Sequence, residues 1–236
     1  VTDDTALPAG AYVGAAWCPT PRALARLGAA GATLPPRPPL EVLQRVNHRR
    51  FGVELSPDVL GSLYVETAAD ALALLAAASP SGRWVAKRAF GLAGRGQRRF
   101  GGAPDELDRH WVEGSFKLGH GLVIEPWVAR EADFVLHGIV DPDGDLRLGR
   151  ALEQDCDARG MWQQTRAAAA GALLEDELHA LGRAGVETGE ALARAGYFGP
   201  FGIDAFRYRD ASGARAFVPR VEINARYCMG WGLSGL

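Results

Sequence analysis

One short stretch near the end of the chain alternates between apolar side chains and side chains that can do chemistry. In the run 221–226 the apolar residues alternate with Glu222, Asn224 and Arg226, which therefore share one face of an extended strand. Glu and Asn supply oxygen ligands for a hard cation such as Mg²⁺, and Arg forks onto the oxygens of phosphate or carboxylate. The run predicts either a site for a cation and an anion or an amphipathic strand whose polar face meets only water.

A second carboxylate is spaced so that it can join this row. Residues 199–208 are predicted as a strand, 210–213 as a turn, and the run containing Glu222 as the return strand. Asp204 and Glu222 lie nine residues on either side of Gly213, so a hairpin turning there makes them cross-strand neighbours within about 5 Å. Two adjacent carboxylates repel each other unless a cation lies between them. The spacing therefore favours a metal site over a solvated strand face.

A lysine and a group of glycines form the second chemical motif. Lys87 lies near the end of a predicted strand, 83–90, and Gly91, Gly94 and Gly96 follow it directly. Bare backbone N–H groups of such a loop can close around phosphate oxygens. The spacing matches neither the dinucleotide fingerprint nor the P-loop, whose lysine follows its glycines. The loop is therefore either the tip of a triphosphate-binding hairpin or an ordinary hairpin turn, with the strand resuming at 97–100.

The elements that position these residues follow from periodicity and capping. A βα unit is predicted over 11–30 and a buried strand over 122–124, where Pro126 marks either a sheet edge or a crossing between two sheets. The segment 153–162 has no period and is expected to be an irregular loop that lines a pocket. Further helices are predicted over 41–50, 68–78, 104–116 and 173–194, and further strands over 134–140 and 146–152.

Composition limits the classes of function. The 236 residues are 47% hydrophobic and 23% charged, as in an ordinary globular protein. A net charge of −2 gives no field that draws the protein to nucleic acid or to an anionic membrane, so we expect a small-molecule partner. Neither a signal peptide nor an apolar run of about 20 residues is seen, which predicts a soluble cytoplasmic protein. The three cysteines lack the spacing of a disulfide framework or a zinc site.

The order of these parts resembles the ATP-grasp superfamily over residues 47–230. The resemblance rests on the Lys87 strand, the glycine hairpin, the strand ending at Glu125, the long helix, and the pairing of Asp204 with Glu222-Ile223-Asn224-Ala225-Arg226. It implies an α+β fold in which two lobes with mainly antiparallel sheets hold ATP between them. We expect a fragment that lacks parts at both ends, with the tail of a preceding Rossmann-like domain at 1–46, a small lobe at 47–127 and a large lobe at 128–236.

The resemblance also implies a function. ATP-grasp enzymes use ATP to phosphorylate a carboxylate, which an amine or another nucleophile then attacks. We therefore expect an ATP-dependent carboxylate–amine ligase that uses Mg²⁺ or Mn²⁺ and acts on a small-molecule carboxylate and amine. A small-molecule phosphotransferase and a non-catalytic ATP-binding module are the alternatives.

Roles for individual residues follow from the same resemblance. Asp204, Glu222 and Asn224 would hold the metal, and Arg226 would stabilise the acyl phosphate and the tetrahedral intermediate. Many members carry an earlier phosphate-binding lysine, where this chain offers Arg49 or Arg50, and Arg159 is expected near the acceptor. The nucleotide would be bound by a phosphate lysine, the backbone of the glycine loop, an adenine hinge and one ribose carboxylate. These are Lys87, Gly91, Gly94, Gly96, Glu125, Pro126, Trp127, Val128 and either Glu131 or Asp133.

Overall fold

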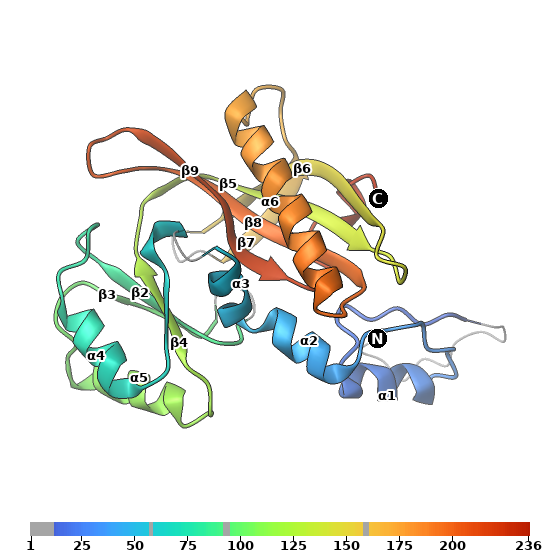
Figure 1. The fold of residues 1–236 in the computed structure, drawn as a ribbon, viewed down its shortest axis with the longest axis horizontal. Helices are drawn as coiled ribbons and strands as arrows, with labels where there is room; N and C mark the ends of the chain where they lie inside the picture. Colours follow the sequence, from blue (N-terminus) through green and yellow to red (C-terminus); the bar gives the residue numbers. More distant parts are fainter. Residues whose placement is uncertain (1–11, 57–58, 92–94, 158–160) are drawn as a thin grey trace.

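Two antiparallel sheets with helices packed on them make up the protein (Figure 1). The structure is a computed structural model that describes residues 12–56, 59–91, 95–157 and 161–236. Four strands form the small sheet in the order β1-β4-β2-β3, and five form the large sheet in the order β7-β6-β5-β8-β9. The predicted α+β class, with mainly antiparallel sheets, is therefore confirmed.

The small sheet is covered by two capped helices. Its strands are β1 (Leu63–Val65), β2 (Trp84–Arg88), β3 (Gln97–Phe100) and β4 (Leu122–Pro126). Helices α4 (Ala68–Ala76) and α5 (Glu106–Phe116) pack with it around a core that includes Leu75, Phe100 and Ile124. The predicted cap of α4 is present, because Asp70 N donates to Thr67 Oγ1 at 3.1 Å. β2 and β3 pair as the predicted hairpin.

One long helix covers the large sheet. The strands are β5 (Arg130–Val140), β6 (Leu146–Cys156), β7 (Trp162–Ala167), β8 (Gly199–Arg209) and β9 (Arg215–Asn224), and the helix is α6 (Glu175–Arg194) (Figure 1). Two glycines let α6 approach the sheet closely. A Cβ on Gly185 would lie 2.7 Å from Leu136 Cδ2, and a Cβ on Gly189 would lie 2.5 Å from Leu146 Cδ1. Bulkier residues at either position would force the helix away from the core.

The N-terminal third differs from its prediction in two places. Helix α1 (Pro21–Ala29) is present, but a single parallel bridge between Val13 and Thr33 replaces the strand of the predicted βα unit. The helix predicted over 41–50 is wrong as one element, because α2 (Leu40–Asn47) and α3 (Arg49–Leu55) are separated by His48 in an extended conformation. His48 leaves the helix and caps the next one, since Arg50 N donates to its Nδ1 at 3.2 Å.

The segment predicted as an irregular loop at 153–162 is also corrected. β6 continues to Cys156 and β7 begins at Trp162, with Asp155 opposite Gln164 and Cys156 opposite Trp162. Most side chains of β7 are exposed, so the sequence carries no hydrophobic alternation there and the strand could not be recognised from its pattern. Arg159 lies outside the described residues.

The chain passes between the sheets directly after Pro126. β4 lies between β1 and β2, so Pro126 ends an inner strand, and β5 begins at Arg130 in the other sheet. Of the two interpretations of this proline, the crossing point is therefore confirmed. The predicted boundary at residue 46 falls within α2, whose Leu43 and Val46 pack in the core of the large sheet, and our division into domains stays a proposal.

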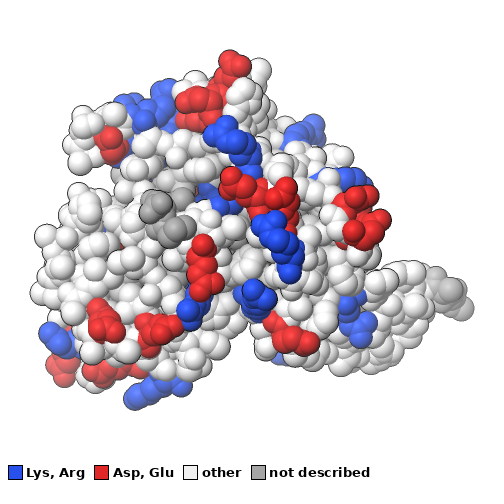
Figure 2. Space-filling view, viewed as in Figure 1, with Lys and Arg blue, Asp and Glu red and all other residues white. Residues whose placement is uncertain are grey.

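On the face shown in Figure 2, basic and acidic side chains lie intermixed, in keeping with the small net charge. No helix of the described residues is long and apolar enough to cross a membrane.

Candidate functional site

A cleft of about 430 Å³ brings together residues from both sheets. This volume is in the range of small-molecule sites. Strand β2 contributes Lys87, the start of the glycine loop contributes Gly91, and strands β5, β8 and β9 contribute Asp133, Asp204 and Glu222. Trp127, Asn224, Arg226 and Arg49 also line it. The cleft therefore collects many of the residues that the sequence singled out, from positions far apart in the chain.

The predicted pair of carboxylates faces each other across β8 and β9. Asp204 is the register partner of Glu222, as the spacing around Gly213 predicts. The route differs from a regular hairpin, because the rungs near the turn, such as Arg209 opposite Arg215, are centred one residue earlier. A bulge in β9 around Pro219 restores the predicted pairing, and a proline is tolerated there because a bulged residue needs no ladder hydrogen bond.

The electrostatics of this pair suit a cation. Burial raises the pKa of the Asp204 carboxyl to about 7, and the negative charge of Glu222 adds to the shift. Burial opposes ionisation of Glu222 as well, but the positive charges of Arg49 and Lys87 outweigh it, so the pKa of Glu222 lies below its ordinary value. Asn224 Nδ2 donates to Asp204 Oδ2 at 3.1 Å, which brings the carboxamide into the same cluster.

The donor set is small but chemically suited to Mg²⁺. Two carboxylates and one carboxamide oxygen are hard oxygen ligands. Among the described residues, no group of three or more His, Cys, Asp and Glu side chains is placed to hold a metal ion. A cation at Asp204, Glu222 and Asn224 would therefore depend on further oxygens from a nucleotide or from water, as Mg²⁺ commonly does.

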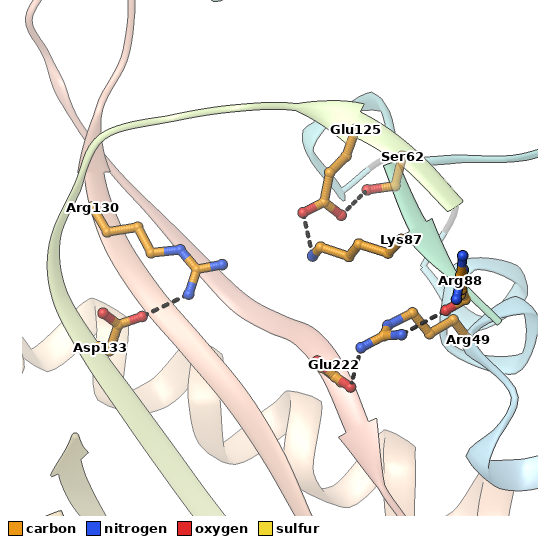
Figure 3. Close-up of polar contacts among 8 residues, drawn as sticks. All are labelled: Arg49, Ser62, Lys87, Arg88, Glu125, Arg130, Asp133 and Glu222. Atoms are coloured by element: carbon orange, nitrogen blue, oxygen red, sulfur yellow. Dashed lines mark hydrogen bonds and ion pairs between the residues drawn. The ribbon is translucent and has the colours of Figure 1, made fainter. Parts of the chain in front are cut away.

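Arg49 lies between the carboxylates and the glycine loop. Its Nη2 donates to Glu222 Oε1 at 2.8 Å and its Nη1 donates to Arg88 O at 2.6 Å (Figure 3). A Cβ on Gly91 would lie 2.6 Å from Arg49 Nη1, so a side chain at this position would displace the guanidinium. Arg50 instead pairs with Glu54 and Glu66 at the surface. Of the two arginines considered from the sequence, the structure brings Arg49 into the cleft.

Lys87 is paired within the protein. Its Nζ donates to Glu125 Oε1, and Ser62 Oγ donates to the other oxygen of the same carboxylate at 3.3 Å (Figure 3). The side chains of Lys87 and Glu125 are only 7% and 5% exposed. Glu125 was predicted to face an adenine amino group, yet its carboxylate is turned toward Lys87. The two residues are diagonal neighbours on β2 and β4, which sequence spacing could not reveal.

The other predicted hinge residues are Pro126, Trp127 and Val128. Of these, Trp127 lines the cleft, and its backbone N–H donates to Arg83 O at 2.9 Å. The two ribose candidates are separated by the structure. Asp133 lines the cleft and accepts from Arg130 Nη1 at 2.8 Å (Figure 3), whereas Glu131 pairs with Arg209 at 2.7 Å away from it.

The glycine loop is described only at its two ends. Gly96 has a φ of +78° and its carbonyl accepts from Arg88 N at 2.8 Å, so a glycine is required where the hairpin returns to β3. Gly94, a predicted phosphate contact, lies outside the described residues.

Asn47 is a positioning residue that the sequence did not reveal. β9 ends at Asn224, two residues before Arg226, which corrects the expectation of one strand through all three polar residues. Asn47 Nδ2 donates to Ala225 O at 3.2 Å, and Ala225 N donates to Asn47 Oδ1 at 3.0 Å. This carboxamide takes the place of a neighbouring strand and fixes the backbone from which Arg226 enters the cleft. An Asn at a helix end was the one available signal, because such residues often hydrogen-bond to backbone.

Comparisons with known proteins show similarity in structure. No protein-family model matches the chain, and no curated protein matches it by sequence. The biotin carboxylase of Campylobacter jejuni, in a complex described as β-γ-ATP, superposes with a TM-score of 0.60 at 16% identity, over 90% of this chain and 47% of that one. The biotin carboxylase domain of the Hydrogenobacter thermophilus 2-oxoglutarate carboxylase, with MgADP, ADP and bicarbonate, gives 0.60 at 14% identity, over 89% and 46%.

A third solved structure is the N5-carboxyaminoimidazole synthetase of Staphylococcus aureus with ADP. It gives a TM-score of 0.57 at 15% identity, over 93% of this chain and 60% of that one. The chain thus spans about half of the length of these proteins. At such identities the likeness establishes a shared fold, and the activity has to be argued from the site.

Proposed function

We propose that this chain, which has the ATP-grasp fold, is the ATP-binding part of a ligase that activates a carboxylate and couples it to an amine. The observation that carries the proposal is the cross-strand pair Asp204 and Glu222 in the same cleft as Lys87. Solved structures of the same fold that hold ATP, ADP or MgADP support a nucleotide in such a cleft.

The reaction would proceed in two displacements. A carboxylate oxygen of the substrate attacks the γ-phosphorus of ATP, the bond from that phosphorus to the β,γ-bridging oxygen breaks, and ADP leaves. The amine nitrogen then attacks the carbonyl carbon of the acyl phosphate, phosphate leaves with the bonding electron pair, and the amine loses a proton. No side chain has to act as a covalent nucleophile, so catalysis depends on positioning and on charge stabilisation.

Arg49 and Lys87 would bind the phosphates. Both cations already lie at the cleft, and each is held by a carboxylate, Glu222 or Glu125. A triphosphate offers more negative charge than one carboxylate, so either cation can turn to it without becoming an unpaired buried charge. Trp127 would form one side of the adenine end and Asp133 would accept from the ribose hydroxyls.

Asp204, Glu222 and Asn224 would hold Mg²⁺ or Mn²⁺. When bound, such an ion neutralises charge on phosphate oxygens. The raised pKa of Asp204 fits this assignment, because it reports a buried carboxyl beside a second carboxylate. Arg226 would stabilise the oxygens of the acyl phosphate, as a fixed cation beside developing negative charge. That role separates a ligase from a phosphotransferase that acts on a hydroxyl, which makes no acyl intermediate.

ATP affinity with and without Mg²⁺ tests the proposal. We expect Glu222→Gln to remove most of the Mg²⁺ dependence of binding, while the matched control Glu190→Gln, which changes an exposed glutamate on α6, leaves it unchanged. Equal ATP affinity in Glu222→Gln, Lys87→Ala and the unaltered protein would rule the site out.

ADP release from a panel of carboxylates and amines then tests the reaction. Formation of a stable phosphorylated alcohol would favour the phosphotransferase instead. ATP binding without ADP release on any substrate would favour a non-catalytic module.

A further inference from the structure

The part of the cleft beside Arg226 is walled by large apolar side chains that remain exposed. Trp17, Trp162 and Met229 all line the cleft, and they are 46%, 36% and 42% exposed. Exposed side chains of this size are common as single residues, but a group of them in one concave site marks a surface that a ligand covers.

Both tryptophans are linked to the segment that follows Arg226, Trp17 through its backbone and Trp162 through its ring. Trp17 O accepts from Tyr227 N at 3.0 Å. Trp162 Nε1 donates to Thr165 Oγ1 at 2.8 Å, and Thr165 packs on Gly230, where a Cβ would lie 2.4 Å from Thr165 Cγ2. The backbone of Trp17 and the ring of Trp162 are therefore held against residues 227–230, and both tryptophans line the same cleft as Arg226.

Arg226 differs from the other three cations of the cleft, one of which, Arg130, pairs with Asp133. Arg49 pairs with Glu222 and Lys87 pairs with Glu125, whereas no ion pair joins Arg226 to a carboxylate of the described residues. A planar guanidinium presents a fork of N–H donors that matches a carboxylate. Arg226 therefore offers a cationic fork in the same cleft as the flat apolar faces of the two tryptophans.

We propose that the carboxylate substrate carries a planar aromatic or heteroaromatic ring, an inference that rests on the proposed function. Its ring stacks against Trp17 and Trp162 with Met229 in contact, and its carboxylate is held by Arg226. Aromatic rings pair favourably with indoles in stacked or edge-on arrangements, and a thioether adds a contact that adapts to the ring edge. A saturated ring of similar size offers no π-face and gains only the area it buries.

Direct binding tests the inference. The protein is titrated with benzoate, cyclohexanecarboxylate and benzamide by calorimetry, with and without Mg²⁺ and a non-hydrolysable ATP analogue. We expect benzoate to bind about five- to tenfold more tightly than cyclohexanecarboxylate, the size of an aromatic pair contact. Trp162→Ala should remove that preference, and Trp162→Phe should keep it. Arg226→Gln should remove the preference for benzoate over benzamide while leaving the ring preference in place.

A matched control is Leu107→Ala, which shortens a side chain that is 70% exposed on α5 and should change none of these affinities. Equal affinity for benzoate and cyclohexanecarboxylate, or no binding of benzoate, overturns the inference. ATP binding and ADP release are measured separately. ADP release with aliphatic carboxylates alone leaves the proposed function standing and removes this inference, whereas a benzoate preference that depends on Trp162 supports it even if ATP fails to bind.

Discussion

The two ends of the cleft differ in whether their side chains are paired with other side chains of the protein. At the end next to the small sheet, Arg49 and Lys87 each bind a carboxylate and lie largely out of contact with water. At the end beside Arg226, the indoles of Trp17 and Trp162 are half exposed.

This difference follows from what each group can tolerate without a ligand. A buried charge that lacks a partner costs several kcal/mol, so the two cations at the end next to the small sheet need carboxylate partners within the protein. An exposed tryptophan costs far less, because much of any protein surface is apolar. Under the proposed function, a ligand at the first end would exchange ion-pair partners, and a ligand at the second end would cover exposed apolar surface.

The largest expected effect comes from breaking the pair at the small sheet. Lys87→Met should lower the free energy of unfolding by about 3–5 kcal/mol, because it leaves Glu125 buried without its cation. The double variant Lys87→Met/Glu125→Leu should regain most of that loss. Urea unfolding measures both, and Arg50→Met, which breaks only exposed pairs, should cost at most about 1 kcal/mol. A Lys87→Met protein as stable as the unaltered one would contradict the buried ion pair that sets this end of the cleft apart.

A second prediction concerns His137, a buried histidine in strand β5 of the large sheet. His137 is fully buried, its ring lies 5.5 Å from that of Trp231, and neither ring nitrogen hydrogen-bonds to a described residue. Burial lowers its pKa to about 4. The unfolded chain takes up this proton near pH 6.5, so between pH 6.5 and 4 it binds the proton that the folded protein refuses. The unfolding free energy should therefore fall as pH drops through this window, by about 3 kcal/mol at most.

Denaturant unfolding at several pH values measures this dependence. His137→Leu should weaken it in the same window, because the titrating group is removed from both states. An unchanged pH dependence in His137→Leu would mean that other groups cause it.

A third prediction sharpens the role of Arg49. Arg49→Ala should weaken ATP binding about tenfold, the range of one hydrogen bond to a charged group, while Arg50→Ala should leave it unchanged. Equilibrium titration with ATP and Mg²⁺ measures both. If Arg50→Ala has the larger effect, the assignment between the two arginines is wrong.

The smallest effect is expected at the start of the glycine loop. Gly91→Ala places a methyl group where the Arg49 guanidinium lies and should weaken ATP binding about threefold by displacing it. Gly101→Ala is the matched control, because a Cβ there meets nothing within 4 Å. Combining Gly91→Ala with Arg49→Ala should add little, since both act on the same contact.

The sequence was most informative where function depends on spacing along one or two strands. The distance of Asp204 and Glu222 from Gly213 predicted their pairing, and Lys87 before the glycines predicted the hairpin. Contacts between separate elements could not be derived in this way. The contact between Glu125 and Lys87 depends on the register of β2 and β4. The hydrogen bonds of Asn47 to Ala225 depend on where the end of α2 meets the large sheet.

The hydrogen bonds from Asn47 to Ala225 also bear on whether the large sheet can pair with a strand of another molecule. β9 is the outer strand of the large sheet, and the free N–H and C=O groups of such a strand can recruit the strand of another molecule. By hydrogen-bonding to both backbone groups of Ala225, Asn47 occupies the continuation of that edge directly beside the carboxylates. One carboxamide therefore shields from intermolecular strand pairing the same short stretch of backbone that positions Arg226.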